Sequence, residues 1–107
     1  MVWNVELSDE VEEWLEAATP RQRAAFFVAA DRLAAAGNAL RMPYSRSLGD
    51  GLFELRFTAG DVAQRVTYVF EPVRRVITLT TFRKQRNNER REVARARRWQ
   101  ARLEKKG

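Results

Sequence analysis

Residues 51–70 read GLFELRFTAGDVAQRVTYVF, and this stretch decides the fold of the chain. On each side of Ala59-Gly60-Asp61, apolar and polar residues alternate with the period of two that is typical of a β-strand with one buried face. A short turn that contains glycine suits the chain reversal of a hairpin. We therefore expect two adjacent antiparallel strands, the first from Gly51 to Thr58 and the second over 62–70.

The same alternation assigns side chains to the two faces of this hairpin. Glu54 and Arg56 are two positions apart, so they share a face of the first strand. From there they could form cross-strand ion pairs with Arg65 of the second strand. Tyr68 shares its face with two apolar neighbours, and it is therefore expected in the core.

The residues that follow the hairpin extend the sheet and then form a helix. Glu71-Pro72 breaks the second strand, and the alternation over 74–82 predicts a third antiparallel strand. Asn87 or Asn88 can cap a final helix, with Glu89 in its first turn. We expect three adjacent antiparallel strands, with one face of the sheet on the helices and the other partly open.

The N-terminal half of the chain predicts a short strand and two helices. Residues 2–7 alternate like a strand, and apolar residues over 9–18 recur at helical spacing. Thr19-Pro20 begins a second helix, which Gly37 ends as a left-handed cap. We expect the two helices to form a hairpin and residues 38–50 to form a loop.

These elements give the order β-α-α-β-β-β-α in one α+β domain over residues 1–107, with the helical hairpin and the C-terminal helix against a mostly antiparallel sheet. A chain of 107 residues can build one hydrophobic core. Its composition, 45% hydrophobic and 32% charged, is that of a folded globular protein.

Two residue types with distinctive chemistry are missing, because the chain has no cysteine and no histidine. Disulfides and thiolate chemistry are excluded, and a zinc site would need carboxylates alone, which is an unusual ligand set. We therefore expect no metal and no cofactor. No apolar run approaches membrane-spanning length, and the N-terminus lacks a signal pattern, so we expect a cytoplasmic protein without a membrane partner.

Charge is distributed unevenly along the chain. Residues 1–20 contain six acids and no Lys or Arg, whereas residues 83–107 contain eleven Lys or Arg and three Glu. Such a molecule can present a basic surface to a polyanion. The simpler interpretation is a solvated basic helix that keeps the protein soluble.

Four stretches resemble a known family: Leu48-Gly49-Asp50-Gly51-Leu52-Phe53-Glu54-Leu55-Arg56, Arg65-Val66-Thr67-Tyr68, Leu79-Thr80-Thr81-Phe82-Arg83-Lys84, and Glu89 with Glu92-Val93-Ala94-Arg95-Ala96. In these stretches, which fall within about residues 44–97, the chain resembles the RelE/HigB superfamily of type II toxin–antitoxin toxins, nearest to its HigB-like, phage-derived branch. The resemblance implies a RelE-like fold and, for most known members, an mRNA endonuclease (mRNA interferase) that cuts on the translating ribosome. It also implies a cognate antitoxin, which in the HigB branch commonly carries a helix-turn-helix domain, as in HigA-like proteins.

Such an enzyme needs no metal, since the substrate's own 2′-hydroxyl can attack the phosphate. Cationic side chains would stabilise the charge that develops on the phosphate, and the candidates are Arg56, Arg65, Arg83 and Lys84. Glu54, or Lys84 with a lowered pKa, could be the general base, and Tyr68 could donate a proton if it turns toward the site. The alternative for Glu54 is a structural role as an ion-pair partner of the arginines.

Further cations could contact ribosomal RNA rather than the cleaved strand: Arg86, Arg90, Arg91, Arg95 and Arg98. The chain departs from RelE-type enzymes because no tyrosine follows Phe82 and histidine is missing, so the proton-transfer groups stay open. Two other functions are compatible with the sequence. One is a ParE-like inhibitor of DNA gyrase, although ParE-type relatives generally lack the cations on the sheet. The other is a non-enzymatic RNA-binding module, although the open face carries Arg, Glu and Thr rather than the stacking aromatics of an RRM.

Overall fold

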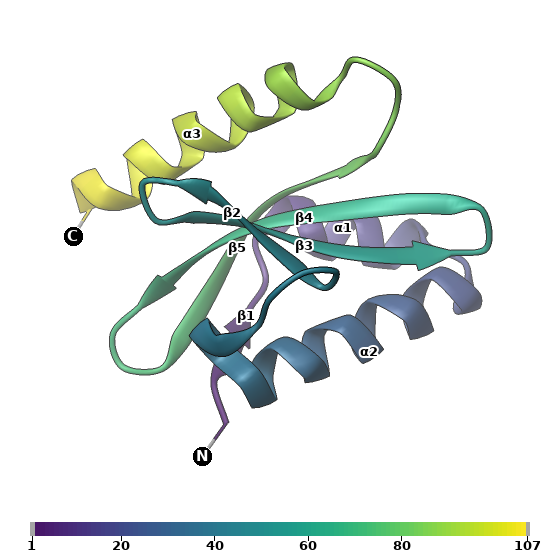
Figure 1. Ribbon diagram of the computed structural model, residues 1–107, viewed down its shortest axis with the longest axis horizontal. Coiled ribbons are helices and arrows are strands. Elements are labelled where there is room, and N and C mark those ends of the chain that lie inside the picture. Colours follow the sequence, from purple (N-terminus) through teal and green to yellow (C-terminus); the bar gives the residue numbers. More distant parts are fainter. Residues whose placement is uncertain (1, 107) are drawn as a thin grey trace.

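A five-stranded sheet with helices on both faces forms the body of the protein (Figure 1). The computed structural model describes residues 2–106. The strands lie in the order β1-β5-β4-β3-β2, and only the pairing of β1 with β5 is parallel. The predicted α+β class is thus confirmed. In chain order the elements are β1 (Asn4–Glu6), α1 (Asp9–Ala17), α2 (Pro20–Ala36), the 3-10 turn η1 (Gly37–Ala39), β2 (Ser45–Gly49), β3 (Leu52–Ala59), β4 (Val62–Glu71), β5 (Arg75–Arg83) and α3 (Glu89–Lys106).

The three strands predicted from the alternation form within one residue of their expected bounds. β3 and β4 pair in one continuous register that places Arg56 opposite Arg65. The pairing of β4 with β5 shifts between Val66 and Tyr68, because β5 carries one extra residue there. Such a bulge reverses the faces on which all later residues of the strand lie.

The prediction that residues 38–50 form a loop is wrong for β2. Gly49 pairs with Leu52, so Asp50 and Gly51 alone make the turn between β2 and β3. Their φ angles are +52° and +79°, as in the type I′ turn that matches the twist of a hairpin. Most side chains of β2 are exposed, because it is the edge strand, so its residues lack the apolar alternation that marks the inner strands.

The two faces of the sheet carry separate hydrophobic clusters. Under α1 and α2, the larger cluster includes Leu33, Leu55 and Tyr68. The smaller cluster lies under α3, where Ala96 packs against Leu52 and Leu79. α3 and α2 therefore lie on opposite sides of the sheet (Figure 1). The smaller cluster covers only part of the sheet face on which α3 lies. Buried polar residues, among them Glu54, Arg65 and Thr67, occupy other positions on that face.

The predicted starts of α1 and α2 are confirmed by their hydrogen bonds, whereas the Asn88 side chain bonds to Gln85 and Arg83 before α3 instead of capping it. The Ser8 side chain caps α1 by accepting from the backbone of Val11, and Thr19 forms a reciprocal capping box with Gln22 at the start of α2. Gly37 ends α2 with a φ of +55°, and a Cβ atom there would lie 2.0 Å from Nε1 of Trp3. Only glycine allows the indole to pack so closely against this cap.

α1 continues along the edge of β5 beyond the end of β1. The Ser8 backbone N–H donates to Thr78 Oγ1 at 2.9 Å, and Glu10 Oε2 accepts from the backbone N–H of Thr81 at 2.7 Å. These bonds cover polar backbone groups that would otherwise face water at the edge of the sheet. Within residues 2–106, no helix combines the length and the apolar character needed to cross a bilayer.

Candidate functional site

A buried carboxylate and two arginines lie together on the α3 face of the sheet. Glu54 and Arg56 extend from β3, and Arg65 extends from the facing position of β4. Glu54 Oε1 is 3.5 Å from Nε of Arg65 and 3.7 Å from Nε of Arg56. We call these three residues the Glu54 cluster. The sequence placed all three on one face, and the structure brings them into contact.

Glu54 is fully buried, with an exposed fraction of 0%. Among the described residues, neither of its carboxylate oxygens has a hydrogen-bond partner. Burial raises the pKa of Glu54, repulsion from Glu89 raises it further, and the neighbouring arginines oppose these effects. A carboxylate with few partners and a raised pKa costs stability, and such groups are typical of sites that transfer protons.

Arg65 is also buried, with an exposed fraction of 8%. Its Nη1 donates to the backbone carbonyl of Gln64 at 3.2 Å. Burial lowers the pKa of Arg65 and repulsion from Arg56 adds to this effect, but a guanidinium keeps its proton in proteins. Arg65 is therefore a fixed positive charge beside Glu54, and the more exposed Arg56 covers the same carboxylate.

A second set of charges forms the rim above the Glu54 cluster. Glu89, in the first turn of α3, lies with Oε1 3.6 Å from Nη1 of Arg46 and with Oε2 3.8 Å from Nζ of Lys84. The backbone N–H of Lys84 donates to the Ala63 carbonyl at 2.7 Å, which holds Lys84 beside β4. Lys84 was expected from the sequence. Arg46 and Glu89 were not, because Arg46 lies on the unpredicted β2 and Glu89 was assigned only to the start of a helix.

Two candidate residues do not join the Glu54 cluster. Arg83 pairs with Gln64, and Arg65 pairs with Phe82, so the bulge in β5 turns Arg83 to the face opposite Arg65. Tyr68 is buried on the α1 and α2 face, where its hydroxyl group lies 2.5 Å from Ser45 Oγ. Burial raises the pKa of Tyr68. The core position anticipated for Tyr68 is therefore the one observed.

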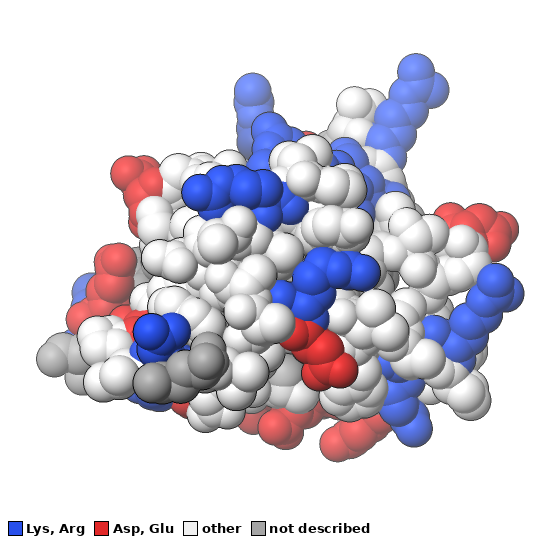
Figure 2. Space-filling model, turned by 60° about the horizontal axis from the view of Figure 1, so that its bottom comes forward, with Lys and Arg blue, Asp and Glu red and all other residues white. Residues whose placement is uncertain are grey.

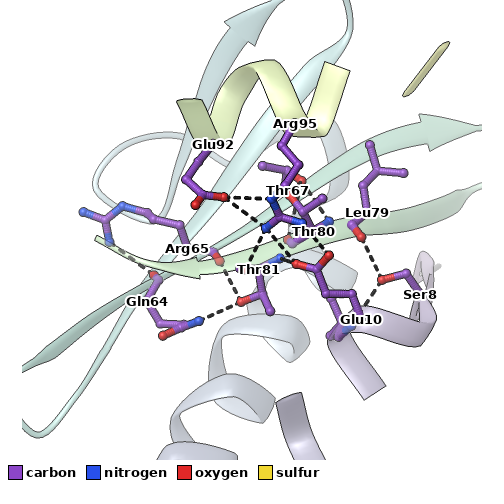
Figure 3. Close-up of polar contacts among 11 residues, drawn as sticks. Ser8, Glu10, Gln64, Arg65, Thr67, Leu79, Thr80, Thr81, Glu92 and Arg95 are labelled. Carbon is purple, nitrogen blue, oxygen red and sulfur yellow. Dashed lines mark hydrogen bonds and ion pairs between the residues drawn. The ribbon is translucent and has the colours of Figure 1, made fainter. Parts of the chain in front are cut away.

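Arg95 joins three elements in a network of charged hydrogen bonds (Figure 3). Its Nη1 and Nη2 donate to the two oxygens of Glu10 at 2.6 and 2.9 Å, and its Nε donates to Glu92 at 3.0 Å. Nη2 also donates to the carbonyl of Thr81 at 3.2 Å. These bonds, the one to Glu10 first, raise the pKa of Arg95. The guanidinium is thus engaged within the protein, so it is less available to RNA than a free surface cation.

The other four expected RNA contacts, Arg86, Arg90, Arg91 and Arg98, have exposed side chains. Figure 2 brings forward the side of the molecule where α2 lies. On that face, cations and carboxylates form small separate groups with uncharged surface between them. The basic character of the protein is therefore local to parts of the surface rather than spread over all of it.

A hollow of about 220 Å³ opens beside the Glu54 cluster. It is lined by Arg56, Arg65, Pro43, Phe57 and Thr58. Both guanidiniums therefore border a space that an anionic group can enter. Guanidinium groups match the oxygens of a phosphate geometrically and electrostatically.

The sequence model of the family described as "Phage derived protein Gp49-like (DUF891)" matches residues 13–100. The chain belongs to this family. The Gp49-like proteins are toxins of the RelE/HigB type, and membership implies an antitoxin partner. A comparison with curated proteins found no match. The match includes every member of the Glu54 cluster and of its rim.

Proposed function

We propose that this Gp49-like protein is a ribosome-dependent mRNA endonuclease of the HigB-like type. The observation that carries the proposal is the Glu54 cluster, in which a buried carboxylate lies 3.5 Å and 3.7 Å from two guanidiniums. A group that accepts a proton and two neighbouring cations are the parts needed to cleave RNA through its own 2′-hydroxyl.

In the proposed reaction, the Glu54 carboxylate takes the proton of the 2′-hydroxyl as the 2′-oxygen attacks the adjacent phosphorus. Arg56 and Arg65 stabilise the negative charge on the phosphate oxygens during this step. The bond from phosphorus to the 5′-oxygen then breaks, and that oxygen takes a proton from Lys84. The products are a 2′,3′-cyclic phosphate and a free 5′-hydroxyl.

The raised pKa of Glu54 suits this role, because a general base works best when its pKa is near the working pH. Burial also means that RNA must gain access to the carboxylate. The RNA phosphate competes with Glu54 for the guanidinium of the more exposed Arg56. When Arg56 moves to bind the phosphate, the Glu54 carboxylate is uncovered. The ribosome would supply the orientation of the mRNA, which contributes strongly to rate when the catalytic groups are modest.

The cognate antitoxin is proposed to be a HigA-like helix-turn-helix protein, and the site of action is the cytoplasm, where ribosomes translate. A neighbouring reading frame that encodes a short helix-turn-helix protein would support this partner. Co-expression with that protein should restore growth to cells that the toxin arrests. Continued arrest despite stable complex formation would contradict the assignment of that protein as antitoxin.

The test of the activity compares mRNA in a translating bacterial lysate with the same mRNA free of ribosomes. We expect cleavage only in the lysate, with cyclic phosphate ends, and loss of cleavage in Glu54→Gln. Glu6→Gln is the matched control, because Glu6 also pairs with an arginine, Arg75, with Oε1 and Nη2 3.0 Å apart. Intact mRNA with accumulating gyrase–DNA breaks would instead indicate a ParE-like toxin. Intact mRNA that binds the protein would indicate a non-enzymatic RNA-binding module.

A further inference from the structure

A second hollow adjoins the one that Arg56 and Arg65 border. It has a volume of about 400 Å³ and lies between α2 and the segment 43–44. The two hollows share Pro43, Arg56, Phe57 and Thr58, so they lie next to each other at Arg56. A volume of this size is within the range of small-molecule pockets, roughly 300–1,000 Å³.

The walls of the second hollow are mostly apolar and partly aromatic. α2 contributes Ala25, Val28 and Ala29, and the opposite side is formed by Tyr44. Tyr44 is exposed, with an exposed fraction of 41%. The Arg32 guanidinium carbon lies 3.8 Å from the centre of the Tyr44 ring. The ring is therefore held against one cation and is still open to a ligand.

Tyr44 is also fixed relative to the Glu54 cluster. Its carbonyl accepts a hydrogen bond from the backbone N–H of Arg56 at 2.9 Å, and its own N–H donates to Arg41 O at 3.0 Å. The Nη1 group of Arg56 contacts Met42 Sδ at 3.0 Å. An aromatic surface and the phosphate-binding arginine are thus held side by side by the backbone.

No carboxylate lines either hollow among the described residues, whereas Arg32, Arg56 and Arg65 do. The space therefore combines positive charge with an exposed aromatic ring and small apolar side chains. Single-stranded RNA offers the complementary pair, a phosphate beside a flat base. Proteins bind such strands by stacking bases on aromatic and guanidinium planes.

We propose that the hollow between α2 and Tyr44 binds the nucleobase of the nucleotide next to the phosphate held by Arg56 and Arg65. The base stacks on the side of the Tyr44 ring that Arg32 leaves open, and the small residues of α2 leave room for it. This inference rests on the proposed function, because it takes the ligand to be RNA. It adds a substrate subsite that the catalytic cluster alone does not provide.

The test uses a short RNA with 2′-O-methyl groups, which cannot be cleaved through the 2′-oxygen, and with 2-aminopurine as the reporting base. Fluorescence should be quenched on binding to the full chain, since the base then stacks on a side chain. Tyr44→Ala should weaken binding by roughly 5- to 150-fold, the range expected for one stacked base. Tyr44→Phe should retain binding, because the ring is preserved.

The matched control is Trp99→Ala. Trp99 is likewise exposed, at 45%, and lies under a guanidinium carbon, that of Arg102, at 4.7 Å. It belongs to α3 and does not line either hollow, so its removal should leave binding unchanged. A second variant, Val28→Trp, fills the hollow from an exposed position on α2 and should weaken binding without disturbing the core.

Several outcomes would overturn the inference. RNA binding that survives both Tyr44→Ala and Val28→Trp, with mRNA cleavage intact, would remove the base subsite and leave the proposed endonuclease standing. Loss of antitoxin binding with unchanged RNA binding would show that the hollow receives a protein instead. If the wild-type chain neither binds the RNA at millimolar concentration nor cleaves mRNA in the lysate, both proposals fail together.

Discussion

The carboxylate of Glu54 lies 3.5 Å from Nε of Arg65, and both groups are buried without a hydrogen bond between them. A buried ion pair is favourable only when its geometry and its hydrogen bonds compensate for the loss of hydration. Here that compensation is incomplete, so the raised pKa of Glu54 and the cost in stability have the same physical cause.

We expect this cost to appear in the dependence of stability on pH. The ordinary pKa of the group is 4.5, and the folded protein holds the Glu54 proton at higher pH than the unfolded chain does. Below the unfolded value, both states are protonated. As the pH rises above it, the unfolded chain loses its proton first, so stability falls until the folded pKa is passed. Glu54→Gln removes this titration, so the free energy of unfolding of the variant relative to wild type should increase as the pH rises above 4.5, the ordinary pKa of the group. Urea denaturation of both proteins at a series of pH values measures the difference between their free energies of unfolding. A difference that does not change with pH would contradict the assigned pKa shift.

Arg56 and Arg83 should differ sharply in their effect on cleavage. Arg56→Gln removes a cation that borders the hollow, and we expect cleavage in the lysate to fall by roughly 10²- to 10³-fold. The register turns Arg83 to the opposite face, so Arg83→Gln should retain cleavage near the wild-type rate. Both variants lose one exposed or half-buried positive charge, which makes them a matched pair. Complete loss of cleavage in Arg83→Gln would support the catalytic role that the sequence suggested for Arg83.

Glu89 should change the pH dependence of cleavage without being a catalytic residue. Its negative charge raises the pKa of Glu54, and it also pairs with Arg46 and Lys84 at the rim. The cleavage rate should rise with pH as Glu54 loses its proton. Glu89→Gln should shift this rise to lower pH, because the Glu54 carboxylate is then easier to form. Glu104→Gln, at the other end of α3, is the control and should leave the profile in place. An unchanged profile in Glu89→Gln would mean that a group other than Glu54 limits the rate.

Arg95 should matter for stability and not for catalysis. Arg95→Gln breaks the bonds to Glu10 and Glu92, and we expect the free energy of unfolding to fall by about 1–2 kcal/mol, a range reduced for partial exposure. Thermal or urea denaturation measures the loss, and Arg91→Gln on the exposed side of α3 provides the control. A double-mutant cycle with Glu10→Gln isolates the coupling between the two helices. Loss of cleavage in an Arg95→Gln protein that folds normally would show that the residue also touches RNA.

The inner strands were predictable because their pattern is strong. Alternation over the hairpin defines which side chains share a face, and the continuous register of β3 and β4 keeps that assignment for Glu54, Arg56 and Arg65. β2 was missed because an exposed edge strand has little apolar pattern. The signal that could have found it is Asp50-Gly51, a dipeptide that favours a two-residue hairpin turn and therefore requires a strand before it.

The remainder of the candidate site depends on tertiary structure. The face of Arg83 depends on one extra residue in β5, which alternation along a single strand does not indicate. Glu89 reaches Arg46, which lies 43 positions earlier in the chain, only because the start of α3 lies beside β2 in the folded protein. Local sequence patterns do not indicate which distant segments meet in the folded protein, so the contact between Arg46 and Glu89 could not be predicted from them.

The bond between Glu10 and Arg95 joins positions 85 residues apart in the chain. The polypeptide cannot make this connection until Arg95 has been synthesised, and the helix that carries Arg95 also carries Glu89 at the rim. Assembly of the charged surface is therefore postponed until α3 is available to fold against the sheet. A nascent copy from which Arg95 has not yet emerged lacks the finished arrangement of charges.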